Sequence, residues 1–188
     1  MTTNESTITI HMVSSLDGFI AKKDGDISWF ESKDNYEKGV TVTKEIAEEF
    51  VKAIDCYIMG SHTYEHALEL SWTYGWVYGD TPTFVLSHRN LPVERKNIEI
   101  YSGDLNELVS DRLKPNYRNI WLVGGAILAK DFIRLKLADD IRLSILPVIL
   151  GDGTPFLDYL GQEQLLHLKE VTAYKSGMVE LWYQVKKG

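Results

Sequence analysis

The stretch IWLVGGAILAKDFIRLKL, residues 120–137, decides the fold class of this chain. Its first four residues are apolar and predict a buried strand, and Gly124 and Gly125 follow directly. The apolar residues from Ala126 to Leu137 then recur with the spacing of an amphipathic helix. A buried strand that passes through glycines into a helix is typical of an α/β protein. The helix positions expected to face inward are Ile127, Phe132, Ile133 and Leu137.

The same alternation of strands and helices continues on both sides of this stretch. Two apolar runs separated by Lys175-Ser176-Gly177 predict a C-terminal hairpin. Because the other strands are short and apolar, we expect an α/β sheet buried on both faces, with the hairpin as antiparallel edge strands. Strands are expected at residues 7–13, 56–59, 83–86, 98–101, 120–123 and 141–150, and helices at 41–53, from 62 with Ser61 as the cap, 105–113 and 126–137.

Composition limits the classes of function. The chain has 188 residues, 44% of them hydrophobic and 25% charged, so we expect one globular domain over residues 1–188. The formal net charge of -7 argues against a nucleic-acid or membrane-surface binder, which needs basic patches. No apolar run approaches the roughly 20 residues that span a bilayer, and the N-terminus lacks the features of a signal peptide. With Cys56 as the single cysteine, a cytoplasmic protein is expected.

Three expected strand ends carry groups that suit a phosphate-bearing cofactor. Gly60 to Thr63 and Gly124 to Ala126 both place glycine between a strand and a helix, where backbone N–H groups are free. Ser87-His88-Arg89 follows another strand, and its guanidinium suits a ribose 2′-phosphate. Each segment alone is also compatible with an ordinary turn. Because ligands of α/β sheets gather at the carboxyl ends of the strands, we expect the three segments to converge.

Other chemistry is not favoured by the sequence. His62 and His66 are four residues apart, but no glutamate follows His62 directly, so no metal site is expected. Cys56 lies in an apolar strand, where a buried inert thiol is expected. Four aromatic residues between Ser71 and Asp80 are compatible with a substrate wall, a subunit contact or core packing: Trp72, Tyr74, Trp76 and Tyr78.

Four motifs resemble a known family and occur in its order along nearly the whole chain. They are SLDGFIA at 15–21 with Ser28-Trp29 downstream, IMGSHTYE at 58–65, LVGGA at 122–126 and LPVILGDG at 146–153. With them the chain resembles the dihydrofolate reductase-like superfamily, nearest to its riboflavin-biosynthesis reductase branch, the RibD-type C-terminal domain. The resemblance implies a mixed, mostly parallel sheet of about eight strands with helices on both faces and a C-terminal antiparallel hairpin.

The resemblance also implies NADPH as the cofactor. The residues that would bind it are Val13, Ile20, Ala21, Gly60, Ser61, Thr63, Tyr64, Ser87, His88, Arg89, Val123, Gly124, Gly125, Ala126, Ile127 and Leu128. In the family the segment matching 14–29 folds over the nicotinamide, and Asp17 lies towards the substrate. Asp34, five residues beyond Trp29, has the spacing of the carboxylate in folate-reducing members. Asp17 and Asp34 are therefore the candidate catalytic residues.

The implied activity is hydride transfer from NADPH to a heterocyclic substrate, as in 5-amino-6-(5-phosphoribosylamino)uracil reductase of riboflavin biosynthesis. Dihydrofolate reduction and a non-catalytic nucleotide- or pterin-binding module of the same fold are the alternatives. Val123 departs from the riboflavin branch, where this position is usually acidic. Valine cannot accept the hydrogen bond that a carboxylate accepts on the substrate side. The expected partners are a ribosylated aminopyrimidine or pterin-like small molecule and a second copy of the chain in a homodimer.

Overall fold

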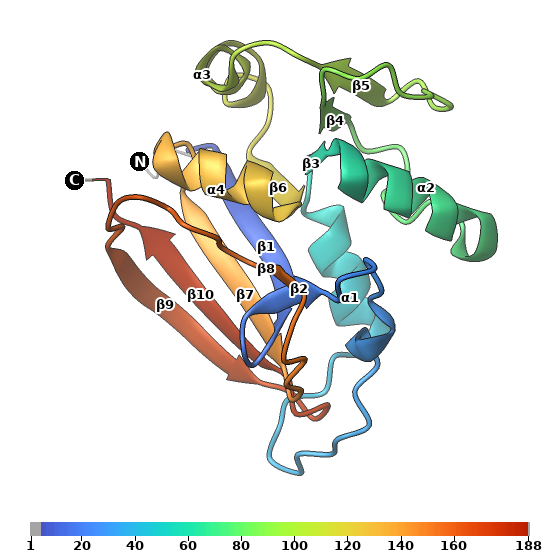
Figure 1. Cartoon of the computed structure of the whole chain (residues 1–188), viewed down its shortest axis with the longest axis vertical. Coiled ribbons are helices and arrows are strands. Elements are labelled where there is room, and N and C mark those ends of the chain that lie inside the picture. Colours follow the sequence, from blue (N-terminus) through green and yellow to red (C-terminus); the bar gives the residue numbers. More distant parts are fainter. Residues whose placement is uncertain (1–4, 188) are drawn as a thin grey trace.

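The computed structural model describes residues 5–187, and its centre is an eight-stranded sheet (Figure 1). The strand order is β5-β4-β3-β6-β1-β7-β10-β9. The six strands from β5 to β7 are parallel, whereas β10 pairs antiparallel with both β7 and β9. This confirms the mixed, mostly parallel sheet with a C-terminal hairpin. The strands are β1 (Thr7–Ser15), β3 (Cys56–Gly60), β4 (Thr83–Leu86), β5 (Ile98–Tyr101), β6 (Asn119–Gly124), β7 (Asp140–Leu146), β9 (Leu166–Ala173) and β10 (Val179–Val185).

Strand β3 shows why these segments read as continuous apolar runs. Cys56 and Ile58 belong to one hydrophobic core, and the alternate residues Tyr57 and Met59 belong to a second core. Side chains of a strand alternate between the two faces of a sheet, so each core lies on its own face. A strand that is buried on both sides has no polar positions left to alternate with.

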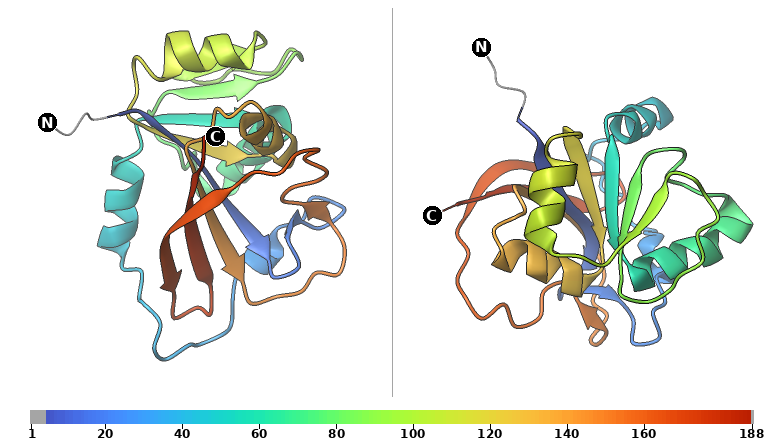
Figure 2. Two further views of the ribbon diagram at one scale, coloured as in Figure 1. Left: turned by 90° about the vertical axis from the view of Figure 1, so that its left-hand side faces the viewer. Right: turned by 90° about the horizontal axis from the view of Figure 1, so that it is seen from above.

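Helices cover both faces of the parallel part of the sheet (Figure 2). One face carries α4 (Ala126–Arg134) and α3 (Leu105–Glu107), which continues into the π-helical turn η2 (Leu108–Leu113). The other face carries α2 (Ser61–Tyr74). Helix α1 (Lys44–Lys52) lies on that same face, where Phe50 contacts His11 and Trp121 edge-on.

Several local expectations are wrong in detail. Ser61 does not cap α2, because it is the first helical residue and Gly60 occupies the cap position without a side-chain hydrogen bond. Strand β7 ends at Leu146, since Pro147 cannot donate to a ladder. Ile127 does not face inward: it is 73% exposed, because the buried face of α4 is formed by Leu128, Ala129, Phe132 and Ile133.

The aromatic segment 71–80 divides between two environments. Trp72 and Tyr74 belong to the last turn of α2 and are exposed. Trp76 and Tyr78 pack against the core that contains Tyr57. Core packing therefore explains half of this cluster, and the two exposed rings remain free for other contacts.

Residues 14–29 contain short regular elements. They include β2 (Phe19–Ala21), which pairs antiparallel with β8 (Thr154–Pro155), and the start of the 3₁₀ turn η1 (Ser28–Phe30). This small second sheet holds the segment against the strand ends of the main sheet. Within residues 5–187 no helix is long and apolar enough to cross a membrane.

Candidate functional site

A cavity of about 1230 Å³ lies at the carboxyl ends of the parallel strands. Five of these strands or the loops that follow them contribute lining residues: Val13 from β1, Gly60 from β3, Ser87 after β4, Tyr101 from β5 and Gly124 from β6. The three segments expected to hold a phosphate therefore reach one cavity. Fourteen predicted site residues line it: Val13, Ile20, Ala21, Gly60, Ser61, Thr63, Ser87, His88, Val123, Gly124, Gly125, Ala126, Ile127 and Leu128.

Two helices begin at this cavity without a side-chain cap. Helix α2 starts after Gly60 and α4 starts after Gly125, and neither glycine has a side chain to bind the first N–H groups. The two starts lie against each other, because a Cβ on Gly60 would be 3.6 Å from the Gly125 nitrogen. Uncapped N–H groups and the positive ends of two helix dipoles form a site for an anionic group such as a pyrophosphate.

Gly124 can be only glycine in this arrangement. Its φ is +146°, and its peptide bond to Gly125 is cis. A Cβ at this position would lie 3.2 Å from Cε of Met12 and 3.6 Å from Oγ1 of Thr63. Any side chain at this position would therefore collide with its neighbours, and Gly124 itself lines the cavity.

The third strand end is only partly in the cavity. Ser87 and His88 line it, and the Ser87 hydroxyl accepts a hydrogen bond from the Arg89 N–H. The Arg89 side chain is not among the lining residues; its guanidinium pairs with Glu65, which does line the cavity. The predicted phosphate contact therefore lies beside the cavity and is engaged with a carboxylate.

Asp17 belongs to residues 14–29, here called the covering segment, and is not among the residues that line the cavity. Its carboxylate accepts hydrogen bonds from the Ser15 hydroxyl at 2.6 Å and from the N–H groups of Leu150 and Gly151 at 3.1 and 2.7 Å. The hydrogen bond from Ser15, together with the two from the backbone, lowers the pKa of Asp17. This places Asp17 as a tether between the β1–β2 turn and the loop after β7.

Two further predicted residues lie away from the cavity lining. Tyr64 is fully buried in the core and donates its hydroxyl hydrogen to the Pro92 carbonyl at 2.7 Å. Asp34 is exposed, and its carboxylate lies against Gly177 in the β9–β10 turn, where an added Cβ would meet Oδ2 at 2.1 Å. Neither side chain is brought to the cofactor segments, and their functional roles stay predictions.

At the other end of the cavity the sequence analysis named only Tyr78 as a candidate contact, and left open whether it is a substrate wall, a subunit contact or core packing. This end has an aromatic and imidazole lining contributed by His11, Phe30, His66, Tyr78 and Trp121. The signal was present for two of them, because His11 and Trp121 precede Val13 and Val123 by two residues and so share their face of the sheet. Burial raises the pKa of Tyr78 to about 12, so its hydroxyl keeps its proton at neutral pH.

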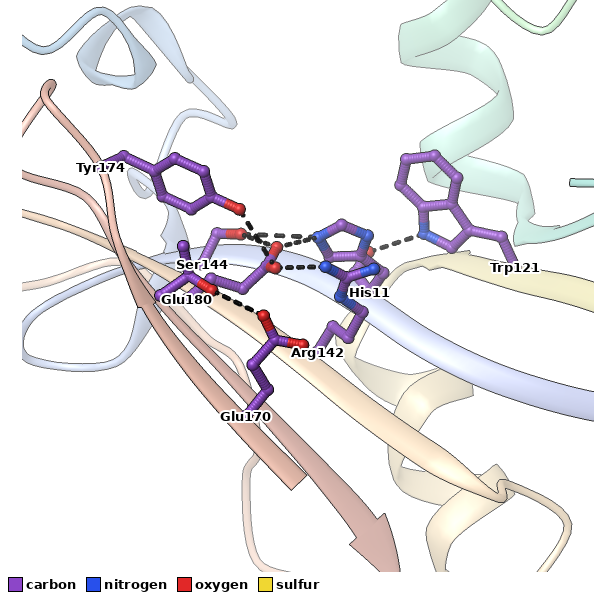
Figure 3. Close-up of polar contacts among 8 residues, drawn as sticks. His11, Trp121, Arg142, Ser144, Glu170, Tyr174 and Glu180 are labelled. Atoms are coloured by element: carbon purple, nitrogen blue, oxygen red, sulfur yellow. Dashed lines mark hydrogen bonds and ion pairs between the residues drawn. The ribbon is translucent and has the colours of Figure 1, made fainter. Parts of the chain in front are cut away.

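His11 belongs to a buried polar cluster on the central strands (Figure 3). Its Nε2 lies 3.2 Å from Oε2 of Glu180 on β10 and 3.4 Å from Oγ of Ser144 on β7. Arg142 pairs with the same carboxylate, and the Tyr174 hydroxyl lies 3.4 Å from it. Burial acts to raise the pKa of Glu180, but the hydrogen bonds from His11 and Arg142 outweigh it and lower the pKa to about 2.

The described residues offer no metal site. No group of three His, Cys, Asp or Glu side chains within 5–187 is placed to hold a metal ion. Cys56 is buried in β3, and desolvation raises the pKa of its thiol. The groups that line the cavity are backbone N–H groups at one end and aromatic walls at the other, a combination that suits an anionic, ring-containing ligand.

The chain is similar to known proteins over nearly its whole length. YwjB of Bacillus subtilis (strain 168) is 28% identical over 166 residues, which cover 88% of this chain and 90% of YwjB. A crystal structure from Shewanella sp. PV-4 has the same fold, with a TM-score of 0.80 and 21% identity, and covers 96% of this chain and 99% of that one.

A second similar structure comes from a longer protein. The diaminohydroxyphosphoribosylaminopyrimidine deaminase/5-amino-6-(5-phosphoribosylamino)uracil reductase of Thermotoga maritima gives a TM-score of 0.67 at 15% identity, over 98% of this chain and 58% of that chain. The sequence model described as RibD C-terminal domain matches residues 6–180. Since this match spans most of the sequence, the chain belongs to the RibD C-terminal domain family.

Proposed function

We propose that this protein is an NADPH-dependent reductase that transfers a hydride to a heterocycle of the aminopyrimidine class. The observation that carries the proposal is the convergence of two uncapped helix starts and the Ser87–His88 turn on one cavity. Membership of the RibD C-terminal domain family supports a reductase. A 5-amino-6-(5-phosphoribosylamino)uracil reductase activity is named for the Thermotoga maritima protein and is a chemical precedent for this proposal.

The residues at the glycine-rich end of the cavity fit a dinucleotide. Backbone N–H groups from Ser61 to Thr63 and from Ala126 to Leu128 would hold the pyrophosphate, with the Thr63 hydroxyl between the two helix starts. Ser87, His88 and Arg89 would hold the adenosine 2′-phosphate. When bound, NADPH supplies the hydride, and the protein supplies orientation and a dry environment.

The covering segment provides the water exclusion that hydride transfer needs. Ile20 and Ala21 line the cavity from β2, and β8 holds this strand through the Ala21–Thr154 pairing. The contact is close, because a Cβ on Gly153 would lie 2.2 Å from the Ala21 carbonyl oxygen. Two apolar side chains are thus held where the nicotinamide would lie.

Thermal unfolding with NADPH, and with NADH as the control, tests the proposal. At about 100 times Kd, binding adds about 2.7 kcal/mol to the free energy of unfolding. For a chain of this length that corresponds to a rise in Tm of roughly 5–11 °C. A rise with NADPH and little with NADH, followed by NADPH oxidation in the presence of a ribosylated aminopyrimidine, is the expected result. No rise with either nucleotide would contradict the proposal.

A second candidate function is nucleotide binding without turnover. Val123 lines the cavity, and its side chain cannot accept the substrate hydrogen bond that an acidic residue accepts at this position in the riboflavin branch. Under this alternative NADPH raises Tm, but no pyrimidine, pterin or flavin precursor is reduced. Turnover of any member of such a panel would exclude it.

A further inference from the structure

The aromatic end of the cavity holds one histidine in a fixed orientation. The His11 ring stacks on Trp121, with 4.9 Å between ring centroids and 27° between planes, and Phe50 meets it edge-on at 5.5 Å. The Trp121 indole N–H also donates to the His11 carbonyl at 2.9 Å. Trp121 precedes Gly124 by three residues, about 10 Å along strand β6. The Trp121 ring therefore lies farther from the carboxyl end of the strand than the glycines do.

The Glu180 carboxylate determines which nitrogen of His11 carries a proton. Glu180 is 6% exposed and already accepts a hydrogen bond from Arg142. As an ionised carboxylate it has no proton to donate, so Nε2 of His11, 3.2 Å away, must be the donor. In the neutral imidazole the other nitrogen, Nδ1, is then a bare acceptor.

That acceptor has no partner among the described residues. Nδ1 of His11 is buried and forms no hydrogen bond within residues 5–187. A buried polar atom without a partner is costly, and such atoms are commonly found at functional sites. His66 also has an unpaired ring nitrogen, but its side chain is more exposed, and Glu69 is 3.9 Å away. Only the His11 ring is fixed by both stacking and a buried carboxylate.

We propose that His11 positions the substrate by accepting an N–H hydrogen bond from its heterocycle at Nδ1, with Glu180 holding the required tautomer. The inference rests on the proposed function and adds the residue that recognises the ring. Trp121 and Tyr78, which line the same end, supply aromatic walls for a planar ligand. The substrate is thus expected to present an amino or ring N–H group to this histidine.

Nitrogen NMR on protein labelled with ¹⁵N-histidine tests the tautomer directly. We expect the neutral His11 ring to carry its proton on Nε2 and to have a bare Nδ1, with the resonance assigned from its absence in His11→Phe. Addition of 5,6-diaminouracil, a planar aminopyrimidine without sugar or phosphate, should shift Nδ1 and leave the exposed His167 unchanged. A proton on Nδ1 in the free protein would overturn the inference. So would an unmoved Nδ1 resonance when the pyrimidine binds.

Binding of 5,6-diaminouracil without nucleotide measures the same hydrogen bond. His11→Phe keeps a ring against Trp121 but removes the acceptor, so Kd should rise roughly 2- to 10-fold. His11→Asn places an amide near the position of Nδ1 and should recover part of the affinity, even if the Phe variant folds poorly. His167→Phe on β9 is the matched control and should leave Kd unchanged. Equal affinity of wild type, His11→Phe and His11→Asn would contradict the inference.

Glu180→Gln tests whether Glu180 acts by holding the His11 tautomer and not by contacting the ligand itself. The variant keeps a hydrogen-bonding group but loses the charge, so His11 should populate both neutral tautomers, and the affinity for 5,6-diaminouracil should fall less than in His11→Phe. An unchanged single tautomer would show that Glu180 does not hold the ring.

If NADPH raises Tm but 5,6-diaminouracil does not bind the wild type, the inference about His11 fails and the proposed function stands. If 5,6-diaminouracil binds through His11 but NADPH does not bind, the proposed function fails instead.

Discussion

The guanidinium of Arg89 donates a hydrogen bond to the carboxylate of Glu65, with 2.6 Å between Nη2 and Oε2. Glu65 lines the cavity from the second turn of α2, whereas Arg89 follows β4. The cation nearest to the expected 2′-phosphate is therefore neutralised by a residue of the same site. A bound 2′-phosphate would compete with Glu65 for the guanidinium.

Arg89→Gln should therefore reduce the preference for NADPH over NADH. A charge-assisted hydrogen bond contributes about 1.5–3 kcal/mol, so Kd for NADPH should rise roughly 10- to 100-fold. Kd for NADH should stay nearly constant, because NADH lacks the phosphate. Glu65→Gln releases the guanidinium and should tighten NADPH binding. Titration calorimetry on the wild type and both variants measures these Kd values, and equal losses of affinity for both nucleotides in Arg89→Gln would contradict the phosphate contact.

Gly124→Ala should abolish nucleotide binding and destabilise the protein. The added Cβ meets Met12 at 3.2 Å, in a backbone conformation with φ of +146° that L-residues rarely adopt. Such strain costs on the order of 1–3 kcal/mol. Gly79→Ala is the matched control, because its φ is also positive at +57° but nothing lies within 4 Å of the new Cβ. It should lower Tm slightly and keep NADPH binding; loss of binding in both variants would point to general misfolding.

Glu180 should make stability fall in acid. Its pKa is near 2 in the folded protein, against an ordinary value of 4.5, so folding favours the ionised form. This contribution is complete above about pH 5 and is lost as the pH falls towards 2. The shift corresponds to about 3 kcal/mol. Urea unfolding from pH 7 to 2.5 should show this loss for the wild type and a shallower loss for Glu180→Gln. Identical slopes would contradict the role of the buried carboxylate.

Asp17→Asn should loosen the covering segment. The Asp17 carboxylate accepts three hydrogen bonds through its two oxygen atoms. The asparagine amide has only one acceptor oxygen, so it cannot keep all three. We expect faster proteolysis within residues 14–29 and a KM for NADPH several-fold higher, with a smaller change in kcat. Loss of kcat alone would instead assign Asp17 a part in proton delivery.

Asp34→Asn tests the folate alternative. Because the Asp34 carboxylate lies against Gly177 and not in the cavity lining, turnover of an aminopyrimidine should change less than twofold. Abolished dihydrofolate reduction in this variant would give Asp34 the catalytic role that its spacing after Trp29 suggests. Steady-state kinetics with an aminopyrimidine and with dihydrofolate decides whether Asp34 has this catalytic role.

The homodimer stays a prediction, and β9 is where we expect it. This strand is the edge of the sheet, and Leu166, Leu168 and Val171 on it are exposed. Exposed apolar edge strands readily pair with another chain. Sedimentation at micromolar concentration should show a dimer that Leu168→Lys weakens. A monomeric wild type would contradict the expectation.

The features of the fold that the sequence predicted well are those determined by residues adjacent in the chain. The strand at 120–123 and its glycines could be recognised because hydrophobic pattern and backbone freedom are local properties. Ser61 was misassigned because glycine and serine both serve at the cap position, and only the backbone path distinguishes them.

Contacts between distant segments could not be predicted in the same way. His11 and Glu180 meet only because β1 and β10 both flank β7, and strand order is not visible in the pattern of any one strand. Likewise, the Arg89–Glu65 pair depends on how α2 lies against the end of β4. The sequence therefore predicted the glycine-rich part of the cavity lining, whose groups are mostly backbone, and missed the wall around His11 and Trp121, whose side chains come from separate strands.

The uncapped starts of α2 and α4 have a consequence for the free protein. With no side chain bound to their first N–H groups, both helix ends leave hydrogen-bonding capacity that a ligand can use. Amide hydrogen exchange at residues 61–63 and 126–128 should then be fast in the free protein and slow when nucleotide is bound. The concentration of reduced nucleotide would thus set how stable the first turns of α2 and α4 are.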